Sequence, residues 1–248
     1  MEADKEKIIL VADYGRSGQG WLSYMLCYLL NARFIEPYDL LKGRQYSSSA
    51  DVLRLTKGNL PGRDKSNYEL IVKTHEYPAS DFNLTDKVLL LCRDPRDVAV
   101  SAYYRYRVMK QQEPARNFKD KISFLIHRLR LASYLLTAYR WQKYYQAWKN
   151  IKCQQIRYED LSLKTKETLK AILAYLEVAA KDSLIDEAIA KFSFEKLTGR
   201  RKGEEDTKNP EFRKGIIGDY ENHFSKLELK IFNLICAKEA RKRGYLIQ

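Results

Sequence analysis

Three groups of polar residues that follow apolar runs could together hold and transfer an anionic group. The first is the glycine-rich turn Gly15–Gly20, which comes between the apolar run Ile8–Ala12 and a helical pattern that begins near Gly20. The N–H groups of such a turn and of the helix N-terminus point at one spot and favour phosphate or sulfate there. Arg16 adds positive charge, so the segment predicts an anion cradle. The plainer interpretation is a simple strand-to-helix turn.

The residues after this turn indicate a cradle that lacks a metal ligand. Nucleotide triphosphatases carry a lysine and then a serine or threonine after the second glycine, where the lysine reaches the terminal phosphates and the hydroxyl holds magnesium. Trp21 and Leu22 stand at these two positions. We therefore expect no bound metal.

A lysine and a histidine stand at the carboxyl end of a second expected strand, Glu69–Thr74. Lys73 and His75 are two residues apart, so their side chains point to the same side. Open α/β sheets bind ligands at this edge, where the glycine turn also lies. The pair suits group transfer, with Lys73 stabilising charge and His75 accepting a proton from an attacking hydroxyl. A structural histidine is the alternative.

Further polar residues follow a third expected strand, Lys87–Cys92. Arg93 can contact a phosphate through two N–H groups. Asp94 suits the N-cap of a helix that begins at Pro95, and Ser101 could reach the same ligand from that helix. A structural ion pair between Arg93 and the nearby Asp97 is the other interpretation.

A third basic site is the segment Arg213–Gly215, whose glycine would allow close approach of the backbone. The chain has two other histidines, His127 and His223, for which we expect structural or solvent-facing roles. These assignments leave His75 as the candidate base.

The composition is that of a basic protein long enough for one α/β domain. Its 248 residues include 45 basic and 32 acidic ones, a net charge of +13, which favours phosphorylated or polyanionic partners and also fits nucleic acid or a membrane surface. We expect no leader peptide, because Met1–Lys7 is polar and the apolar run after it has the length of one strand. No stretch reaches the ~18 apolar residues of a membrane span. The four cysteines lack metal-ligand spacing, which predicts buried free thiols in a reducing, cytoplasmic compartment.

Apolar strands that alternate with helical patterns predict a central parallel sheet flanked by helices. A fourth, weaker strand is expected at Cys153–Tyr158. The expected helices beyond Pro95 cover residues 118–149, 165–179, 183–192 and 226–243. The expected apolar stripe of the last helix is Leu227, Ile231, Leu234, Ile235 and Ala237. We expect a single domain over residues 1–248, with an acceptor loop at 33–68 and a mobile flap at 197–220.

Four separated segments together resemble one family, the cytosolic sulfotransferases that use 3′-phosphoadenosine 5′-phosphosulfate (PAPS). Tyr14–Trp21 resembles their Y-P-K-S-G-T-T-W loop, and Lys73–His75 resembles their K-T-H segment. Arg93–Ser101 is similar to R-N-P-K-D-V-A-V-S, and Arg213–Tyr220 resembles R-K-G-x-x-G-D-W. Two shorter matches are Tyr158–Asp160 with Y-E-D and Ser193–Phe194 with T-S-F. In order and spacing, the resemblance covers residues 8–225.

The resemblance implies a fold like that of nucleotide kinases and transfer of a sulfuryl group to a hydroxyl, with release of adenosine 3′,5′-bisphosphate (PAP). His75 would be the base, and Lys73 and Arg16 would stabilise charge on the transferring group. The residues implied to hold the 5′-phosphosulfate are Arg16, Ser17, Gly18, Gln19, Gly20 and Trp21. Those implied for the 3′-phosphate are Arg93, Ser101, Arg213, Lys214 and Gly215. Tyr158 and Ser193 would contact the adenosine, and Phe194, which follows Ser193 in the T-S-F-like segment, is also implied to bind the cofactor.

The cradle departs from the family pattern at several positions. Arg16 replaces a lysine, which keeps the positive charge but changes a compact ammonium to a planar guanidinium with several N–H donors. Gln19 and Gly20 replace paired threonines, which removes two hydroxyl donors. Backbone N–H groups must therefore make more of the contacts with the phosphosulfate. Phe192 replaces the threonine before Ser193.

The sequence leaves the partners open. The acceptor could be a phenol, an alcohol or a sugar, as a small molecule or a glycan, and no nucleic acid is required. Residues aligned with the family's dimer motif are Glu221, Ser225, Lys226 and Lys230, and Lys226 replaces its valine, which predicts a monomer or a dimer of another type. The alternative functions are a kinase-like phosphotransferase that shares the fold and a non-catalytic nucleic-acid-binding protein.

Overall fold

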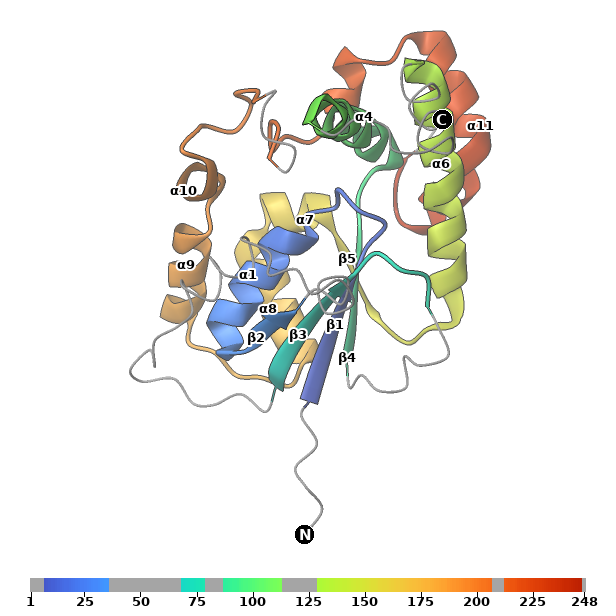
Figure 1. Ribbon diagram of the computed structural model, residues 1–248. Helices are drawn as coiled ribbons and strands as arrows, with labels where there is room; N and C mark the ends of the chain where they lie inside the picture. Colours follow the sequence, from blue (N-terminus) through green and yellow to red (C-terminus); the bar gives the residue numbers. More distant parts are fainter. Residues whose placement is uncertain (1–6, 36–67, 79–86, 113–128, 207–211, 247–248) are drawn as a thin grey trace. The chain divides into compact units, whose positions relative to one another are not determined.

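The computed structural model describes residues 7–35, 68–78, 87–112, 129–206 and 212–246 (Figure 1). The chain divides into two compact units. Unit 1 comprises Met1–Cys92 and Ile151–Ser193, and unit 2 comprises Arg93–Asn150 and Phe194–Gln248.

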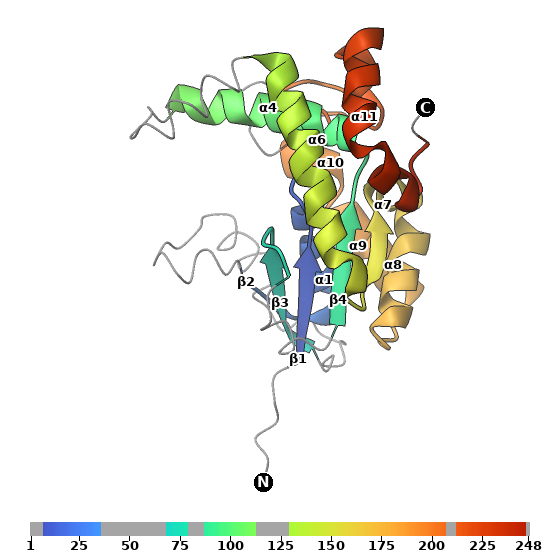
Figure 2. The same ribbon diagram turned by 90° about the vertical axis from the view of Figure 1, so that its right-hand side faces the viewer.

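A parallel sheet forms the centre of unit 1. Its described strands are β1 (Lys7–Ala12), β2 (Arg33–Ile35), β3 (Tyr68–Thr74), β4 (Lys87–Cys92) and β5 (Gln154–Arg157). They lie in the order β2-β3-β1-β4-β5, and all pair in parallel, as Figure 2 shows for β3, β1 and β4. The predicted parallel sheet and its four strands are confirmed, each within two residues at its ends.

The strand order places β1 where the chain changes direction across the sheet. The chain leaves β1 toward β3 on one side and later continues from β4 to β5 on the other. Ligands of open α/β sheets bind outside the carboxyl ends of the strands at such a switch point. The turn after β1 therefore occupies the position expected of a binding loop.

One helical layer of unit 1 consists of α1 (Gln19–Leu30), α9 (Asp182–Lys191) and α8 (Thr165–Tyr175), with the short α7 (Tyr158–Leu163) next to α8 (Figure 1). The first helix packs on the first three strands, α9 packs on α1, and α8 packs on β5. Full burial of Leu22, Met25 and Leu26 explains why the sequence pattern identified α1 correctly.

Unit 2 is helical. Its elements are α4 (Pro95–Gln112), α6 (Arg130–Ala147), η2 (Trp148–Asn150), α10 (Phe194–Thr198), η3 (Asp219–Asn222) and α11 (Lys226–Lys242). The predicted start of α4 is confirmed, because the Asp94 carboxylate accepts the Arg96 N–H at 2.9 Å in the manner of an N-cap. Helix α6 packs against both α4 and α11.

Aromatic side chains form the core between these helices. Tyr134 stacks on Phe224 with ring centroids 4.5 Å apart, and Phe224 meets Phe232 of α11 edge to face at 5.2 Å. Trp141 and Tyr145 are fully buried on the same helix as Tyr134. Such aromatic packing contributes both area and ring geometry to the stability of the unit.

Several expected boundaries and faces are corrected. Arg33–Ile35 is a strand and not part of the expected acceptor loop, whose remaining residues 36–67 lie outside the described chain. The helix expected at 118–149 begins at Arg130, and residues 118–128 also lie outside the described part.

The expected stripe of α11 is wrong at Leu227 and Leu234, which are 68% and 81% exposed. Phe232, Cys236 and Ala240, four residues apart, are buried in their place. A helix period fits either set, and the packing partners select the one that contains the aromatic ring.

Two further features follow from the described residues. Cys27, Cys92 and Cys236 are buried free thiols, and Cys153 is a partly buried one. In the described part of the chain, no helix has the length and apolar character needed to cross a membrane.

Candidate active site

The turn after β1 bends through three residues with left-handed backbone. These are Gly15 (φ 110°), Arg16 (φ 63°) and Gly18 (φ 85°). Gly18 is the N-cap of α1 and has no side chain to accept hydrogen bonds from the first turn of the helix. Alternation of this kind turns backbone N–H groups toward one concave spot, and the helix N-terminus adds its positive dipole. The arrangement fits a bound anion.

Tyr158 lies directly against this turn. A Cβ atom added at Gly18 would stand 2.8 Å from Cδ2 of the Tyr158 ring, so only glycine fits there. The sequence resemblance assigns Tyr158 to the adenosine but does not say which residues surround it. The structure shows that its ring lies beside the anion turn.

The side chain of Gln19 is directed into the sheet. Its amide Nε2 donates to the main-chain oxygens of Val11 and Thr74, the second at 2.8 Å, and the residue is 2% exposed. The amide thus ties the carboxyl ends of β1 and β3 together. Because the side-chain amide is engaged in the sheet, Gln19 could contact the phosphosulfate through its main chain.

Two other residues that were predicted to hold the phosphosulfate, Ser17 and Trp21, form hydrogen bonds within unit 1. The N–H of Ser17 donates to Oδ2 of Asp13 at 3.1 Å. The indole N–H of Trp21 donates to the main-chain oxygen of Phe192 at 2.7 Å. These bonds fix both ends of the turn, while Leu22, at the position of the usual magnesium-binding hydroxyl, is fully buried in the core.

His75 lies beside the start of the turn because β1 and β3 pair in register. Ala12 is opposite Thr74, so Asp13 follows one strand and His75 follows the other. Nδ1 of His75 lies 2.6 Å from Oδ1 of Asp13 and 3.1 Å from the Asp13 main-chain oxygen. Asp13 is buried, whereas 51% of the His75 side chain is exposed.

The pKa of His75 lies above its ordinary value. Burial alone would lower this pKa, but the charge and the hydrogen bonds of Asp13 raise it, and the positive charge of Lys73 acts in the lowering direction. The predicted residues Lys73 and His75 therefore interact electrostatically. Sequence reasoning missed Asp13, and an acidic residue directly after a buried strand was the available signal.

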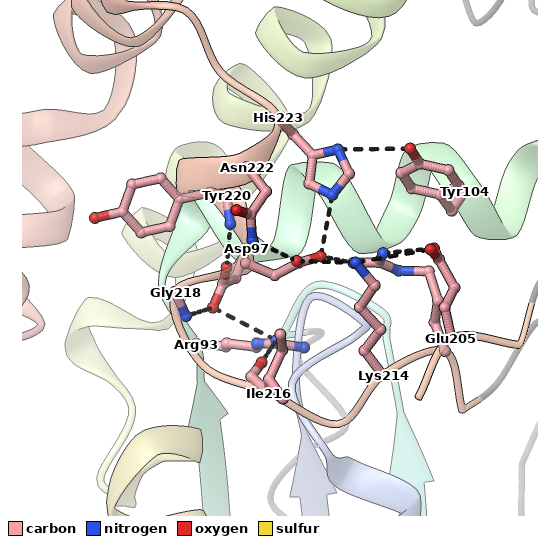
Figure 3. A network of polar contacts seen from close by, with 12 residues as sticks. Arg93, Asp97, Tyr104, Glu205, Lys214, Ile216, Gly218, Tyr220, Asn222 and His223 are labelled. Carbon is pink, nitrogen blue, oxygen red and sulfur yellow. Dashed lines mark hydrogen bonds and ion pairs between the residues drawn. The ribbon is translucent and has the colours of Figure 1, made fainter. Parts of the chain in front are cut away.

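A second polar cluster lies in unit 2 at the start of α4 (Figure 3). The buried carboxylate of Asp97 accepts the N–H groups of Gly218 and Tyr220 at 2.8 Å and 3.0 Å. Arg93 donates to the Ile216 main-chain oxygen at 2.9 Å and approaches Asp97 at 3.5 Å. The ion pair considered for Arg93 is therefore present. Burial raises the pKa of Asp97, against the opposing effects of Arg93 and the two N–H groups.

Asp219 gathers the basic residues of the same cluster. Its carboxylate forms an ion pair with Arg213, and it lies 3.2 Å from Nζ of Lys214 and 3.1 Å from Nε2 of His223. Lys214 and His223 are labelled in Figure 3. Burial alone would raise the pKa of Asp219, but Arg213 and the other donors hold this pKa well below its usual range. Glu205 also pairs with Arg213, at 2.9 Å.

Gly215 is held against an aromatic ring. Its φ is 66°, and an added Cβ would stand 2.6 Å from Cε2 of Phe194. Ser101, a residue of α4, is 7% exposed.

The structure thus groups the predicted residues by unit. Those at the carboxyl edge of the unit 1 sheet are Arg16, Ser17, Gly18, Gln19, Gly20, Trp21, Lys73, His75 and Tyr158. Those of unit 2 are Arg93, Ser101, Phe194, Arg213, Lys214 and Gly215, and Ser193 ends unit 1. His127 lies outside the described residues. Among the residues that are described, no group of three or more histidines, cysteines or acids could hold a metal ion.

A parallel α/β sheet whose central strand ends in a glycine turn, beside a histidine and a lysine, suits an enzyme that transfers an anionic group. Comparison with known proteins gives the particular family. The sulfotransferase domain matches residues 5–244, and the chain belongs to this family.

Curated relatives and solved structures agree with this assignment. The chain is 26% identical to human sulfotransferase 1E1, with 88% of this chain and 78% of that protein covered. It is 26% identical to dog sulfotransferase 1B1, with 93% and 82% covered. The crystal structure of mouse sulfotransferase SULT7A1 complexed with PAP has a TM-score of 0.62 at 21% identity, covering 97% of this chain and 86% of that one. At this identity, the structural likeness shows the fold.

Proposed function

We propose that this sulfotransferase transfers a sulfuryl group from PAPS to the hydroxyl of a small-molecule or glycan acceptor, with His75 as the general base and without a metal ion. Membership of the family supports sulfuryl transfer. Similar solved structures, those of mouse SULT7A1 and of retinol dehydratase, are complexes with PAP, which supports PAPS as the donor.

The observation that carries the proposal is the register of β1 and β3. It places the candidate base next to the anion turn, one residue beyond the paired Ala12 and Thr74. A donor anion on the turn and an acceptor hydroxyl at His75 would then lie at the same edge of one sheet. This closeness is what group transfer requires.

The residues of unit 1 suit the phosphosulfate end of the donor. The turn contributes N–H groups and the N-terminus of a 12-residue helix. Arg16 and Lys73 supply positive charge where negative charge develops on the transferring group. Bound PAPS supplies the sulfuryl group itself.

The residues of unit 2 are proposed for the 3′-phosphate on the strength of the sequence resemblance. Arg93, Arg213 and Lys214 are basic, and each is held by a carboxylate or a main-chain oxygen. Cations that are already oriented lose less side-chain entropy when they bind an anion. A cytoplasmic location and a monomer, or a dimer of a type unlike the family's, stay predictions.

The proposal is tested by incubating the purified protein with labelled PAPS and a panel of phenols, alcohols and sugars in excess EDTA. We expect label on at least one hydroxyl acceptor at a rate that EDTA does not change, because the Trp21–Leu22 pair supplies no magnesium ligand. Calorimetry with PAP provides a second readout. Absence of PAP binding, or loss of transfer in EDTA, would contradict the proposal.

A further inference from the structure

The two side-chain oxygens of Asp13 are directed to two different parts of unit 1. Oδ2 accepts the N–H of Ser17 in the anion turn at 3.1 Å, and Oδ1 lies 2.6 Å from Nδ1 of His75. The residue is fully buried, so its carboxylate oxygens are shielded from bulk water. One carboxylate therefore joins the turn to the candidate base.

These contacts determine which nitrogen of His75 carries the proton. An ionised carboxylate and a main-chain carbonyl only accept hydrogen bonds. Nδ1 of His75 faces one of each, both from Asp13. A neutral imidazole with its proton on Nδ1 can donate to the Asp13 main-chain oxygen at 3.1 Å, whereas the other tautomer would set a lone pair against these acceptors. The contacts therefore favour a proton on Nδ1 and a lone pair on Nε2.

We propose that Asp13 is a positioning residue that fixes His75 in the tautomer with a free Nε2 and holds the ring beside the anion turn. The proposal rests on the proposed function, in which His75 accepts the acceptor's proton. Asp13 itself touches neither the acceptor nor the donor in this role, because both of its oxygens face groups of the protein.

The chemical step is balanced with this assignment. The acceptor O–H bond breaks and an Nε2–H bond forms, while the oxygen's electron pair makes the new O–S bond. The bond between sulfur and the bridging oxygen of PAPS breaks, and its electron pair leaves with PAP. His75 is then an imidazolium, whose charge faces the Asp13 carboxylate.

Two charged groups, Asp13 and Lys73, have the main influence on the charge of His75. The carboxylate favours the imidazolium and the lysine disfavours it, and burial of the ring acts in the same direction as the lysine. Removal of the Asp13 charge alone should therefore lower the pKa of His75.

Nuclear magnetic resonance of protein labelled with ¹⁵N-histidine tests the proposal directly, since the chain has three histidines. In the wild-type protein without ligands, we expect His75 to show a protonated Nδ1 and an unprotonated Nε2 above its pKa. Asp13→Asn should lower the pKa of His75 and reduce the population of this tautomer, because the introduced amide has one oxygen for two donors. The matched control is Glu76→Gln, which removes an exposed carboxylate next to His75 and should leave both quantities unchanged.

The kinetic readout separates positioning from a purely structural role. Asp13→Asn should move the acid limb of the pH profile of kcat/KM to lower pH and reduce the plateau by about tenfold or more. The loss should stay below the ~10⁴-fold known for the corresponding change in a serine protease, because the main-chain oxygen of Asp13 still accepts from Nδ1. A carboxylate that only supports the turn would lower the plateau without moving the limb.

Two results would overturn the proposal. One is a wild-type His75 with its proton on Nε2, which is measurable even if the variant does not fold. The other is an unchanged pKa of His75 in folded Asp13→Asn. Neither readout uses PAPS, so failure of the proposed function would show separately, as a wild-type protein that neither binds PAP nor transfers the label.

Discussion

Each unit contains a histidine next to a buried aspartate, and the two pairs differ in the pKa of the histidine. His75 lies 2.6 Å from Asp13 in unit 1, and His223 lies 3.1 Å from Asp219 in unit 2. The pKa of His75 is raised, whereas that of His223 is lowered, chiefly by burial and also by Arg213 and Lys214, against the effect of Asp219.

The difference lies in what else each carboxylate holds. Asp13 accepts from one neutral N–H group besides the histidine, so its negative charge acts on His75. Asp219 is shared with two cations, Arg213 and Lys214, which also act on His223. Among the described residues, the charge of Asp219 is thus offset by two cations that also act on His223, whereas the other group that the Asp13 carboxylate holds is the neutral N–H of Ser17.

The largest expected effect separates the two histidines. His75→Ala should lower kcat by ~10²–10⁴-fold, the usual contribution of a positioned general base. His223→Ala serves as the matched variant and should change kcat far less, because its ring is bonded within unit 2. Initial rates with an aliphatic alcohol and with an acidic phenol measure this, and the loss should be greater for the alcohol, which ionises less readily. Equal losses of kcat in His75→Ala and His223→Ala would contradict the different roles assigned to the two histidines.

The second-largest expected effect is on nucleotide binding by Arg93, a cation that lies near the Asp97 carboxylate in unit 2. Arg93→Ala should weaken binding of PAP more than binding of AMP, because the 3′-phosphate is what distinguishes the two ligands. A charge-assisted hydrogen bond is worth about 1.5–3 kcal/mol, or about 10- to 100-fold in affinity. Calorimetry with both nucleotides measures the difference.

Arg107→Ala is the control for this measurement. Arg107 is an exposed arginine of α4, the helix that begins two residues after Arg93, and its loss tests whether general positive charge explains the affinity. An equal loss of PAP and AMP affinity in Arg93→Ala would remove Arg93 from the 3′-phosphate site.

The smallest expected effect is on the pH dependence of the free energy of unfolding. His75 has a raised pKa, so its contribution is present below the pKa of about 6.5 in the unfolded chain and is lost as pH rises through the folded value. His223 has a lowered pKa, so its contribution is present above the unfolded value and is lost as pH falls toward the folded one.

Urea unfolding at about pH 5.5 and about pH 8 checks these signs. His75→Ala should cost more stability at the lower pH, and His223→Ala should cost more at the higher pH. The same sign for both variants would mean that the two pairs do not differ in the way described.

The sequence predicted most of the sheet and the main helices because buried parallel strands are short apolar runs and helix starts carry local signals such as Asp94–Pro95. It missed β2 and α7, which are too short to show a period. The exposed Leu227 and Leu234 were misassigned because the packing partners of α11 are distant in the chain.

The candidate site shows the same division. Glycine spacing and the K-T-H segment identified the turn and His75, but the pairing with Asp13 spans 62 residues and depends on the register of two strands. The carboxylate contacts of Arg213 and Lys214 likewise require a folded segment. Local chemistry was predictable, and the partner of each charged group was not.

The buried amide of Gln19 links the anion cradle to the pairing of two strands that are distant in the sequence. It donates to Val11 in the same stretch of chain and to Thr74, which lies 55 residues further along. Parallel strands that are far apart in sequence pair slowly, because chain entropy is lost before the contacts form. A chain in which α1 has formed but β3 has not yet docked holds the turn by one of these two anchors. Both anchors of the cradle are therefore present only when the long-range pairing of β1 and β3 is complete.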